Sequence, residues 1–235
     1  MNNFESLIHK DLRQAGRVLR KVLPQFTERT YKMADFFLRS IRGRCRSDLQ
    51  FEEVYLQRSD GSHLRLCVYS PRIAKADVPG LLLIHGGGYA MGIPEMDEAV
   101  IRQFIGVSGC VVVSPDYRKS PDAPYPAALE DCYNALLWLK EHGPSYNMRE
   151  DQIMVGGSSA GGGLTAALSL YARDRGEVAI AFQMPLYPMI DDRMTTASAR
   201  DNDAPVWNAK SNETAWKLYL GDRYKSHRVP AYAAP

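Results

Sequence analysis

Apolar residues near the start of the chain recur at the three-to-four spacing of amphipathic helices. Between residues 4 and 22 charged side chains separate the apolar ones, and Pro24 then stops the pattern. A second pattern follows, in which Met33, Phe37 and Ile41 lie on one face of a helix. The sequence therefore predicts two N-terminal helices.

The second of these helices runs into a basic stretch. Its members are Arg39, Arg42, Arg44 and Arg46. Such a stretch could contact a membrane surface or a partner. A run of charges more often keeps a helix end in water, so we favour a solvated face.

The pattern then changes to that of strands. Residues 51–57 and 63–69 flank Asp60-Gly61, a pair that supplies the positive φ of a hairpin turn, and they predict an antiparallel sheet edge. Three later runs are short and apolar throughout, as is typical of parallel strands that are buried on both faces. These runs are residues 80–84, 110–113 and 153–155.

Helical segments separate the apolar runs. One is predicted at residues 97–107 and another at 127–141. A further strand is predicted at 178–184, before Pro185, and the polar remainder from Asp191 is predicted to be helical. Alternating strands and helices imply a mostly parallel sheet with helices on both faces.

Composition narrows the class of protein. A chain of 235 residues with 45% apolar content favours one α/β domain. The net charge of +2, from 29 basic and 27 acidic residues, gives no field for nucleic acid, and no segment is long and apolar enough for an integral membrane segment. The cysteines lack the spacing of a metal or redox site, which favours reduced thiols and a cytoplasmic location. They are Cys45, Cys67, Cys110 and Cys132.

One segment carries the features of a catalytic nucleophile. Gly157-Ser158-Ser159-Ala160-Gly161 matches G-x-S-x-G directly after a predicted strand and before a helical run. Ser159 would then sit on a strained turn, where Gly157 and Gly161 must lack side chains for the backbone to pass closely. A glycine-rich packing turn is the simpler alternative. A phosphate loop is disfavoured because the chain has no Gly-Lys-Ser or Gly-Lys-Thr.

A second motif, His85-Gly86-Gly87-Gly88, follows the apolar run at 80–84. Glycines after a strand can turn backbone N–H groups toward a substrate carbonyl. We expect Gly87, Gly88 and Ala160 to form an oxyanion hole. His85 and Gly86 would support the loop, and His85 is a brace in this interpretation and not a general base.

Together these motifs resemble the hormone-sensitive-lipase-like esterases of the α/β-hydrolase fold. Residues 116–121, Asp-Tyr-Arg-Lys-Ser-Pro, are also similar to the family's D-Y-R-x-x-P segment, and the likeness runs from about residue 50 to the end. The resemblance implies an eight-stranded α/β-hydrolase sheet, mostly parallel, with helices on both faces and a helical cap. It implies N-terminal cap helices at 1–50, a core at 51–192 and a second cap segment at 193–235.

The resemblance also implies an activity. Family members hydrolyse carboxylic esters, often of short acyl chains, through a serine acyl-enzyme, without a cofactor or metal. The expected partner is a small-molecule ester. Ser158 departs from the family, which usually has aspartate there, and this affects the hydrogen bonds that steady the turn.

A larger departure concerns the other catalytic groups. The family places an acid and then a histidine after later strands, and we expect those last core strands to be missing from a C-terminally truncated chain that is inactive or weak. Its open sheet edge would favour aggregation or a homo-oligomer. Asp222 and His227 come in the right order, but they fall in the second cap segment.

Two alternatives remain at this point. The first is a non-catalytic ligand receptor or pseudoenzyme of the same fold, which the fold alone does not distinguish from an esterase. The second and weaker one is an interaction module that uses the basic N-terminal helices. Trp207 and Trp216 fit either an apolar substrate pocket or ordinary packing.

Overall fold

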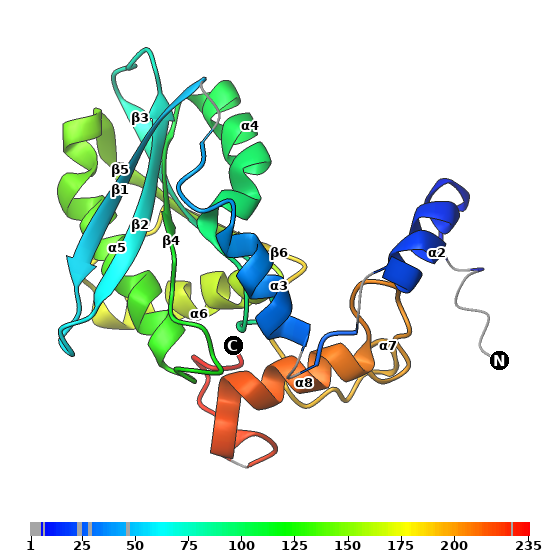
Figure 1. Cartoon of the computed structure of the whole chain (residues 1–235). Coiled ribbons are helices and arrows are strands. Elements are labelled where there is room, and N and C mark those ends of the chain that lie inside the picture. The colour runs from blue at the N-terminus through cyan, green and yellow to red at the C-terminus, as the bar shows by residue number, and fades with distance from the viewer. Residues whose placement is uncertain (1–5, 7, 23–24, 28–29, 46–47, 227) are drawn as a thin grey trace.

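The structure is a computed structural model, and it describes the chain except for residues 1–5, 7, 23–24, 28–29, 46–47 and 227. Its centre is a six-stranded sheet in the order β1-β2-β4-β3-β5-β6 (Figure 1). The strands are β1 (Leu49–Gln57), β2 (His63–Pro71), β3 (Val78–Ile84), β4 (Val111–Pro115), β5 (Met148–Ser158) and β6 (Phe182–Leu186).

The strand directions confirm the two classes of strand that the sequence predicts. β1 and β2 pair antiparallel at one edge, and β2 pairs antiparallel with β4. β4, β3, β5 and β6 are parallel to one another. The carboxyl ends of these four strands therefore lie at one edge of the sheet, where α/β proteins place their sites.

Helices surround the sheet and join its strands. The α-helices are α2 (Arg13–Val22), α3 (Thr30–Arg39), α4 (Glu98–Ser108), α5 (Ala127–His142), α6 (Ala160–Arg175), α7 (Ala197–Arg200) and α8 (Ala209–Leu220). Short 3₁₀ helices are η1 (Lys10–Leu12), η2 (Pro94–Asp97), η3 (Gly143–Tyr146) and η4 (Gly221–Arg223). The predicted helices at 97–107 and 127–141 are thus confirmed as α4 and α5.

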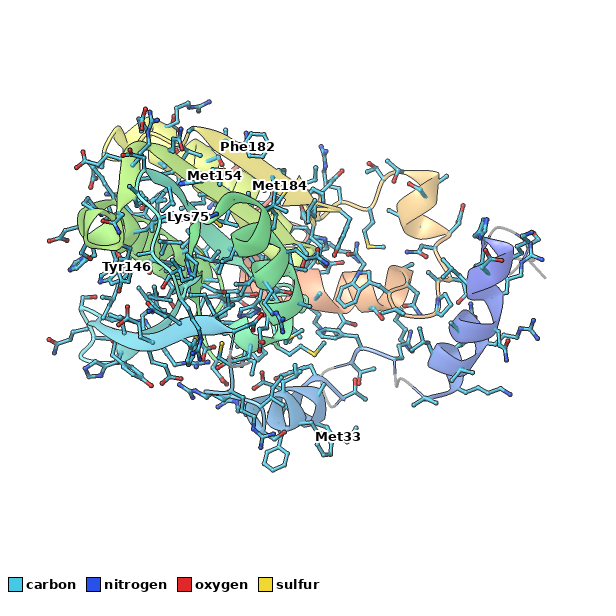
Figure 2. The ribbon with its side chains drawn as sticks, turned by 90° about the horizontal axis from the view of Figure 1, so that it is seen from above. Met33, Lys75, Tyr146, Met154, Phe182 and Met184 are labelled. Atoms are coloured by element: carbon cyan, nitrogen blue, oxygen red, sulfur yellow. The ribbon has the colours of Figure 1, made fainter. Side chains whose placement is uncertain are left out.

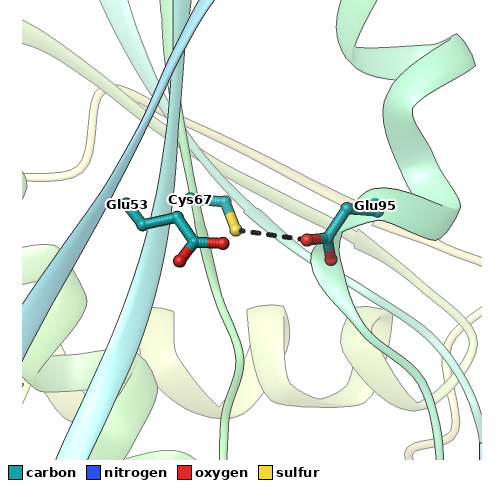
Figure 3. Close-up of side chains that lie close together, drawn as sticks. All are labelled: Glu53, Cys67 and Glu95. Carbon is teal, nitrogen blue, oxygen red and sulfur yellow. Dashed lines mark hydrogen bonds between the residues drawn. The ribbon is translucent and has the colours of Figure 1, made fainter. Parts of the chain in front are cut away.

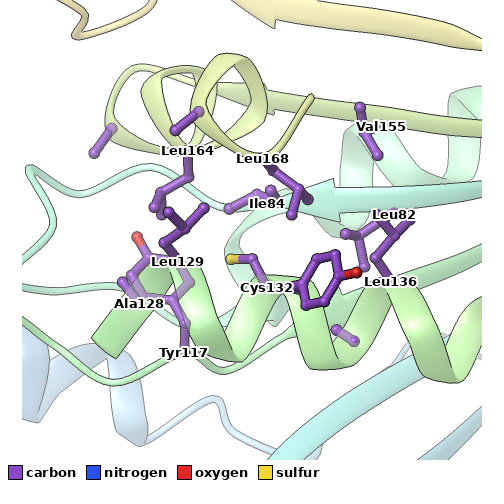
Figure 4. Packing of buried hydrophobic residues seen from close by; sticks show 14 of the residues in the cluster. Leu82, Ile84, Tyr117, Ala128, Leu129, Cys132, Leu136, Val155, Leu164 and Leu168 are labelled. Atoms are coloured by element: carbon purple, nitrogen blue, oxygen red, sulfur yellow. The ribbon is translucent and has the colours of Figure 1, made fainter. Parts of the chain in front are cut away.

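The core lies on both faces of the sheet because successive residues of β3 point in opposite directions. Leu81 and Leu83 pack with α4 on one face. Leu82 and Ile84 pack with α5 and α6 on the other face, where Figure 4 shows leucines of both helices directed at the strands. Helices on both faces are what the uniformly apolar strands predict.

The last strand differs from the prediction. β6 begins at Phe182 and includes Pro185, although the sequence placed the strand at 178–184 with Pro185 after it. Proline has no amide proton to donate, so it is tolerated mainly in edge strands. In the described part of the chain β6 pairs with β5 alone, which leaves it at the edge.

The two N-terminal helices form as predicted within the residues that the structure describes. Their apolar residues, however, are largely turned outward: Val22 on α2 is 68% exposed and Phe37 on α3 is 64% exposed. Figure 2 shows Met33 on the outer side of α3. Tyr31 and Asp35 are the buried residues of α3.

The basic stretch that begins at the end of α3 is partly paired with acids. Arg39 contacts Asp35 at 2.8 Å, and Arg42 lies 3.9 Å from Asp116. Arg46 falls outside the described residues. No helix in the described part of the chain has the length and apolar character needed to cross a membrane.

Segments from the two ends of the chain meet above the loop that follows β3. The ring of Phe26 lies 5.1 Å from that of Trp207. Arg20 Nη1 donates to Asp203 Oδ2 at 2.9 Å. A Cβ atom on Gly88 would lie 2.6 Å from the Trp207 ring, so both segments cover this loop.

Candidate active site

Ser159 stands on the sharp turn between β5 and α6. Its φ of 56° and ψ of −117° are rare for a residue with a side chain. Its amide donates to the Leu186 carbonyl at 2.9 Å, and its own carbonyl accepts from Gly163 and Met189 at 3.0 Å. Bonds from α6, β6 and the next loop therefore hold the strained turn, with a half-buried Ser159 at its tip.

The glycines on either side of the turn have no room for a side chain. A Cβ atom on Gly157 would lie 2.5 Å from the Gly161 carbonyl oxygen. A Cβ atom on Gly161 would collide with the Ile84 carbonyl of β3. This close passage of backbone is the physical reason that the G-x-S-x-G pattern identifies the turn.

The glycine loop after β3 lies beside the serine. A Cβ atom on Gly86 would be 3.6 Å from the Ser159 Cβ. Gly87 and Gly88 have φ of 118° and 59°, and neither amide donates to any residue in the described part of the chain. Ala160 begins α6, so its amide has no acceptor within the helix. The loop and the helix thus offer free N–H groups next to the serine.

His85 lies under this loop and is completely buried. Its Nδ1 is 2.8 Å from the Gly86 carbonyl oxygen, and its ring stacks on Tyr117 with centroids 4.2 Å apart. Burial, followed by the nearby charge of Lys119, lowers the pKa of His85 to about 3. The ring is therefore neutral at pH 7 and packed away from the cavity, an arrangement unsuited to a general base.

A cavity of about 680 Å³ opens at Ser159. Aromatic and apolar side chains dominate it, including Trp207 and Trp216, which the sequence left open between pocket and packing. No histidine lines this cavity among the residues that the structure describes. Asp222 belongs to η4 and does not line it, and His227 falls outside the described residues.

Two site features carry no sequence signal. Asp97, at the end of η2, lines the cavity, and burial raises the pKa of its carboxyl to about 6. Lys119, half-buried beneath the loop, places its Nζ 3.1 Å from Nε2 of His85. The position of Asp97 in the cavity and the contact of Lys119 with His85 both depend on the fold, so no local pattern could have identified them.

A group of potential metal ligands lies elsewhere. Glu53, Cys67 and Glu95 gather beside β2 (Figure 3). The guanidinium of Arg65 bridges the two acids, with Nη1 at 2.8 Å from Glu53 and 2.7 Å from Glu95. Burial raises the pKa of the Cys67 thiol, which opposes thiolate formation. The arginine already supplies the positive charge that a metal would bring.

Comparison with known proteins places this geometry in a family. A model of the alpha/beta hydrolase fold matches residues 81–235. Esterase LipI of Mycobacterium tuberculosis is 37% identical over 162 residues, which are 68% of this chain and 50% of LipI. An arylesterase of Saccharolobus solfataricus is 36% identical over 128 residues, 54% of this chain and 41% of that protein. The chain spans about half the length of such curated relatives.

Solved structures of esterases superpose on nearly the whole of this chain. A bacterial heroin esterase superposes with a TM-score of 0.86 at 30% identity, covering 99% of this chain and 75% of that one. A hyperthermophilic esterase from the archaeon Pyrobaculum calidifontis has a TM-score of 0.79 at 28% identity. The match covers 97% of this chain and 74% of that one. The chain therefore belongs to the α/β-hydrolase fold family, in its hormone-sensitive-lipase-like esterase branch.

Proposed function

We propose that this chain supplies the nucleophile and the oxyanion hole of a serine carboxylesterase. The observation that carries the proposal is the strained Ser159 beside a glycine loop whose amides have no acceptor in the described part of the chain. Strain of this kind is typical of the nucleophile in α/β-hydrolases. The substrate would be a small ester that enters the cavity at Ser159, and esterase names among the relatives support this class.

In the proposed reaction the Ser159 Oγ attacks the ester carbonyl carbon, and its proton passes to a histidine base. The carbonyl oxygen becomes an oxyanion that accepts hydrogen bonds from Gly87, Gly88 and Ala160. The carbon–oxygen bond to the alcohol then breaks, and the protonated base donates its proton to the departing alcohol. Water, deprotonated by the same base, then attacks the acyl carbonyl carbon. The bond from this carbon to the Ser159 Oγ breaks, the carboxylic acid leaves, and the base returns the proton to the Oγ.

We assign the histidine base and its orienting acid to a part of the protein outside the residues that the structure describes. His85 is buried and neutral, and no other described histidine lines the cavity. Without a base the serine hydroxyl keeps its high pKa, so the chain alone should turn over esters weakly. The segments 1–50 and 193–235 would form the cap, as the Phe26–Trp207 contact supports.

The test compares residues 1–235 with a version extended to the end of the natural gene, using p-nitrophenyl acetate. We expect turnover in the extended protein that Ser159→Ala abolishes and that Ser169→Ala, on the distal part of α6, preserves. Strong turnover by residues 1–235 that Ser159→Ala abolishes would disprove the assignment of the base. Inactivity of both folded proteins would favour a non-catalytic receptor.

Two smaller proposals concern the location of the protein and the self-association of the chain. Cys67, Cys110 and Cys132 are buried free thiols, which supports a reducing, cytoplasmic location. A fluorophosphonate probe should label Ser159 of the extended protein in cell cytoplasm. Self-association of the chain through the outer edge of β6 is the second proposal.

A further inference from the structure

The charged side chains that line the Ser159 cavity are all acidic. They are Asp97 and Asp191, and no lysine, arginine or histidine of the described residues joins them. A negatively charged cavity wall repels anions and attracts cations. The negative charge of the cavity wall therefore affects which esters can enter.

The two acids differ in how far the protein neutralises them. Asp191 Oδ1 accepts a hydrogen bond from Arg193 Nε at 2.8 Å. Asp97 forms no ion pair or hydrogen bond with another residue in the described part of the chain, and burial is the sole cause of its raised pKa. Its charge at neutral pH is thus left for a ligand to offset.

The rest of the cavity suits the hydrocarbon part of a cation. Three aromatic side chains line it, Tyr187, Trp207 and Trp216, together with methionines and small apolar residues. Aromatic faces attract quaternary and protonated amines through their quadrupole. A carboxylate plus aromatic rings is a combination that recognises an organic ammonium group better than an uncharged alkyl group of the same shape.

We propose that Asp97 is a specificity-determining residue that favours esters bearing a cationic amine and disfavours esters bearing an acid. This inference rests on the proposed esterase function for its choice of substrate class. Asp97 acts here through charge and not through the reacting atoms. The nucleophile and the oxyanion hole are needed for any ester, whereas Asp97 decides between esters of equal shape.

The test measures binding and needs no turnover. Acetylcholine and 3,3-dimethylbutyl acetate differ only in a quaternary nitrogen against a quaternary carbon. Their affinities for the Ser159→Ala chain are measured by titration with tryptophan fluorescence, since two tryptophans line the cavity. We expect acetylcholine to bind about tenfold more tightly, a preference within the range of a charge pair combined with cation–π contacts.

Two variants locate the source of the preference. Asp97→Asn should bring the two affinities within about twofold, while Asp191→Asn, already offset by Arg193, should keep most of the difference. Equal affinities in the parent, absence of binding by both esters, or a preference that survives Asp97→Asn would overturn the proposal. If the parent shows no cation preference while the extended protein has Ser159-dependent turnover, this proposal fails and the esterase function stands. If the parent shows the preference but the extended protein turns over no ester, only the esterase function fails.

Discussion

The Nζ atom of Lys119 lies 3.1 Å from Nε2 of His85, directly beneath the loop that presents the proposed oxyanion amides. Nδ1 of the same ring is 2.8 Å from the Gly86 carbonyl oxygen, which can only accept a hydrogen bond. An ammonium group can only donate. The two contacts are therefore satisfied together by one neutral tautomer, with the proton on Nδ1.

Lys119→Met removes the donor to Nε2 that fixes this tautomer, and it should loosen the glycine loop. We expect kcat of the extended protein to fall about tenfold, in the range seen for residues that orient a functional group, with a smaller change in KM. Nitrogen-15 NMR of the ring should show a protonated Nδ1 in the parent and a mixture of tautomers in the variant. A protonated Nε2 in the parent would contradict the assignment, whatever the activity.

Asp97 predicts a pH-dependent effect on stability. Burial raises its pKa to about 6 in the fold from 3.8, so between these values the folded state binds more protons than the unfolded state. Ionised Asp97 therefore destabilises the fold, and this cost disappears as pH falls from 6 to 3.8. Asp97→Asn should raise the free energy of unfolding at pH 8 and leave it almost unchanged at pH 3.5. Urea denaturation at both pH values checks this, and an equal gain at both would contradict it.

The glycines of the turn predict a contrast between two alanine substitutions. Gly161→Ala would drive a Cβ atom into the Ile84 carbonyl, so we expect a loss of about 3 kcal/mol or failure to fold. A Cβ atom on Gly106, inside α4, would meet no other atom within 4 Å. Gly106→Ala should stabilise by about 0.5–1 kcal/mol through helix propensity. Thermal unfolding of both variants measures the difference, and similar melting temperatures would show that the turn relaxes.

Arg118 of the D-Y-R segment and Arg58 both pair with Asp131 of α5, and these pairs predict a further effect on stability. This carboxylate is fully buried, and it accepts from Arg58 Nε at 2.8 Å and from the Arg118 amide at 2.8 Å. Arg118 Nε also donates to Asp131 Oδ2 at 3.1 Å, so the loss of Arg58 leaves the buried carboxylate with one cation instead of two. Arg58→Met should therefore lower the free energy of unfolding by about 2 kcal/mol. Arg149→Met removes an exposed pair with Asp151 and should change it little. Equal effects of the two substitutions would mean that Asp131 relaxes into water.

The parts of this protein that could be predicted from sequence depend on local requirements. The turn at Ser159 needs glycine on both sides, and parallel strands buried on both faces need uninterrupted apolar runs. Pro185 misled the prediction because whether a strand tolerates proline depends on how it pairs in the sheet, which the local sequence does not show. Asp97 and Lys119 were missed for a similar reason: Asp97 acquires its role from its place in the cavity and Lys119 from the distant His85, and both depend on the whole fold.

The outer edge of β6 predicts self-association of the chain. In the described part of the protein β6 pairs only with β5, and Phe182 on it is 57% exposed; Figure 2 shows Phe182 and Met184 close together at this rim. An edge strand with unpaired backbone groups and an apolar side chain is a template for pairing with another chain. We expect the sedimentation coefficient of residues 1–235 to rise with concentration, and Phe182→Lys to reduce that rise by placing a charge on the edge. Val107→Lys, on a more exposed apolar residue of α4, provides the matched control. If both substitutions have the same effect, association is general hydrophobic aggregation and does not use this strand.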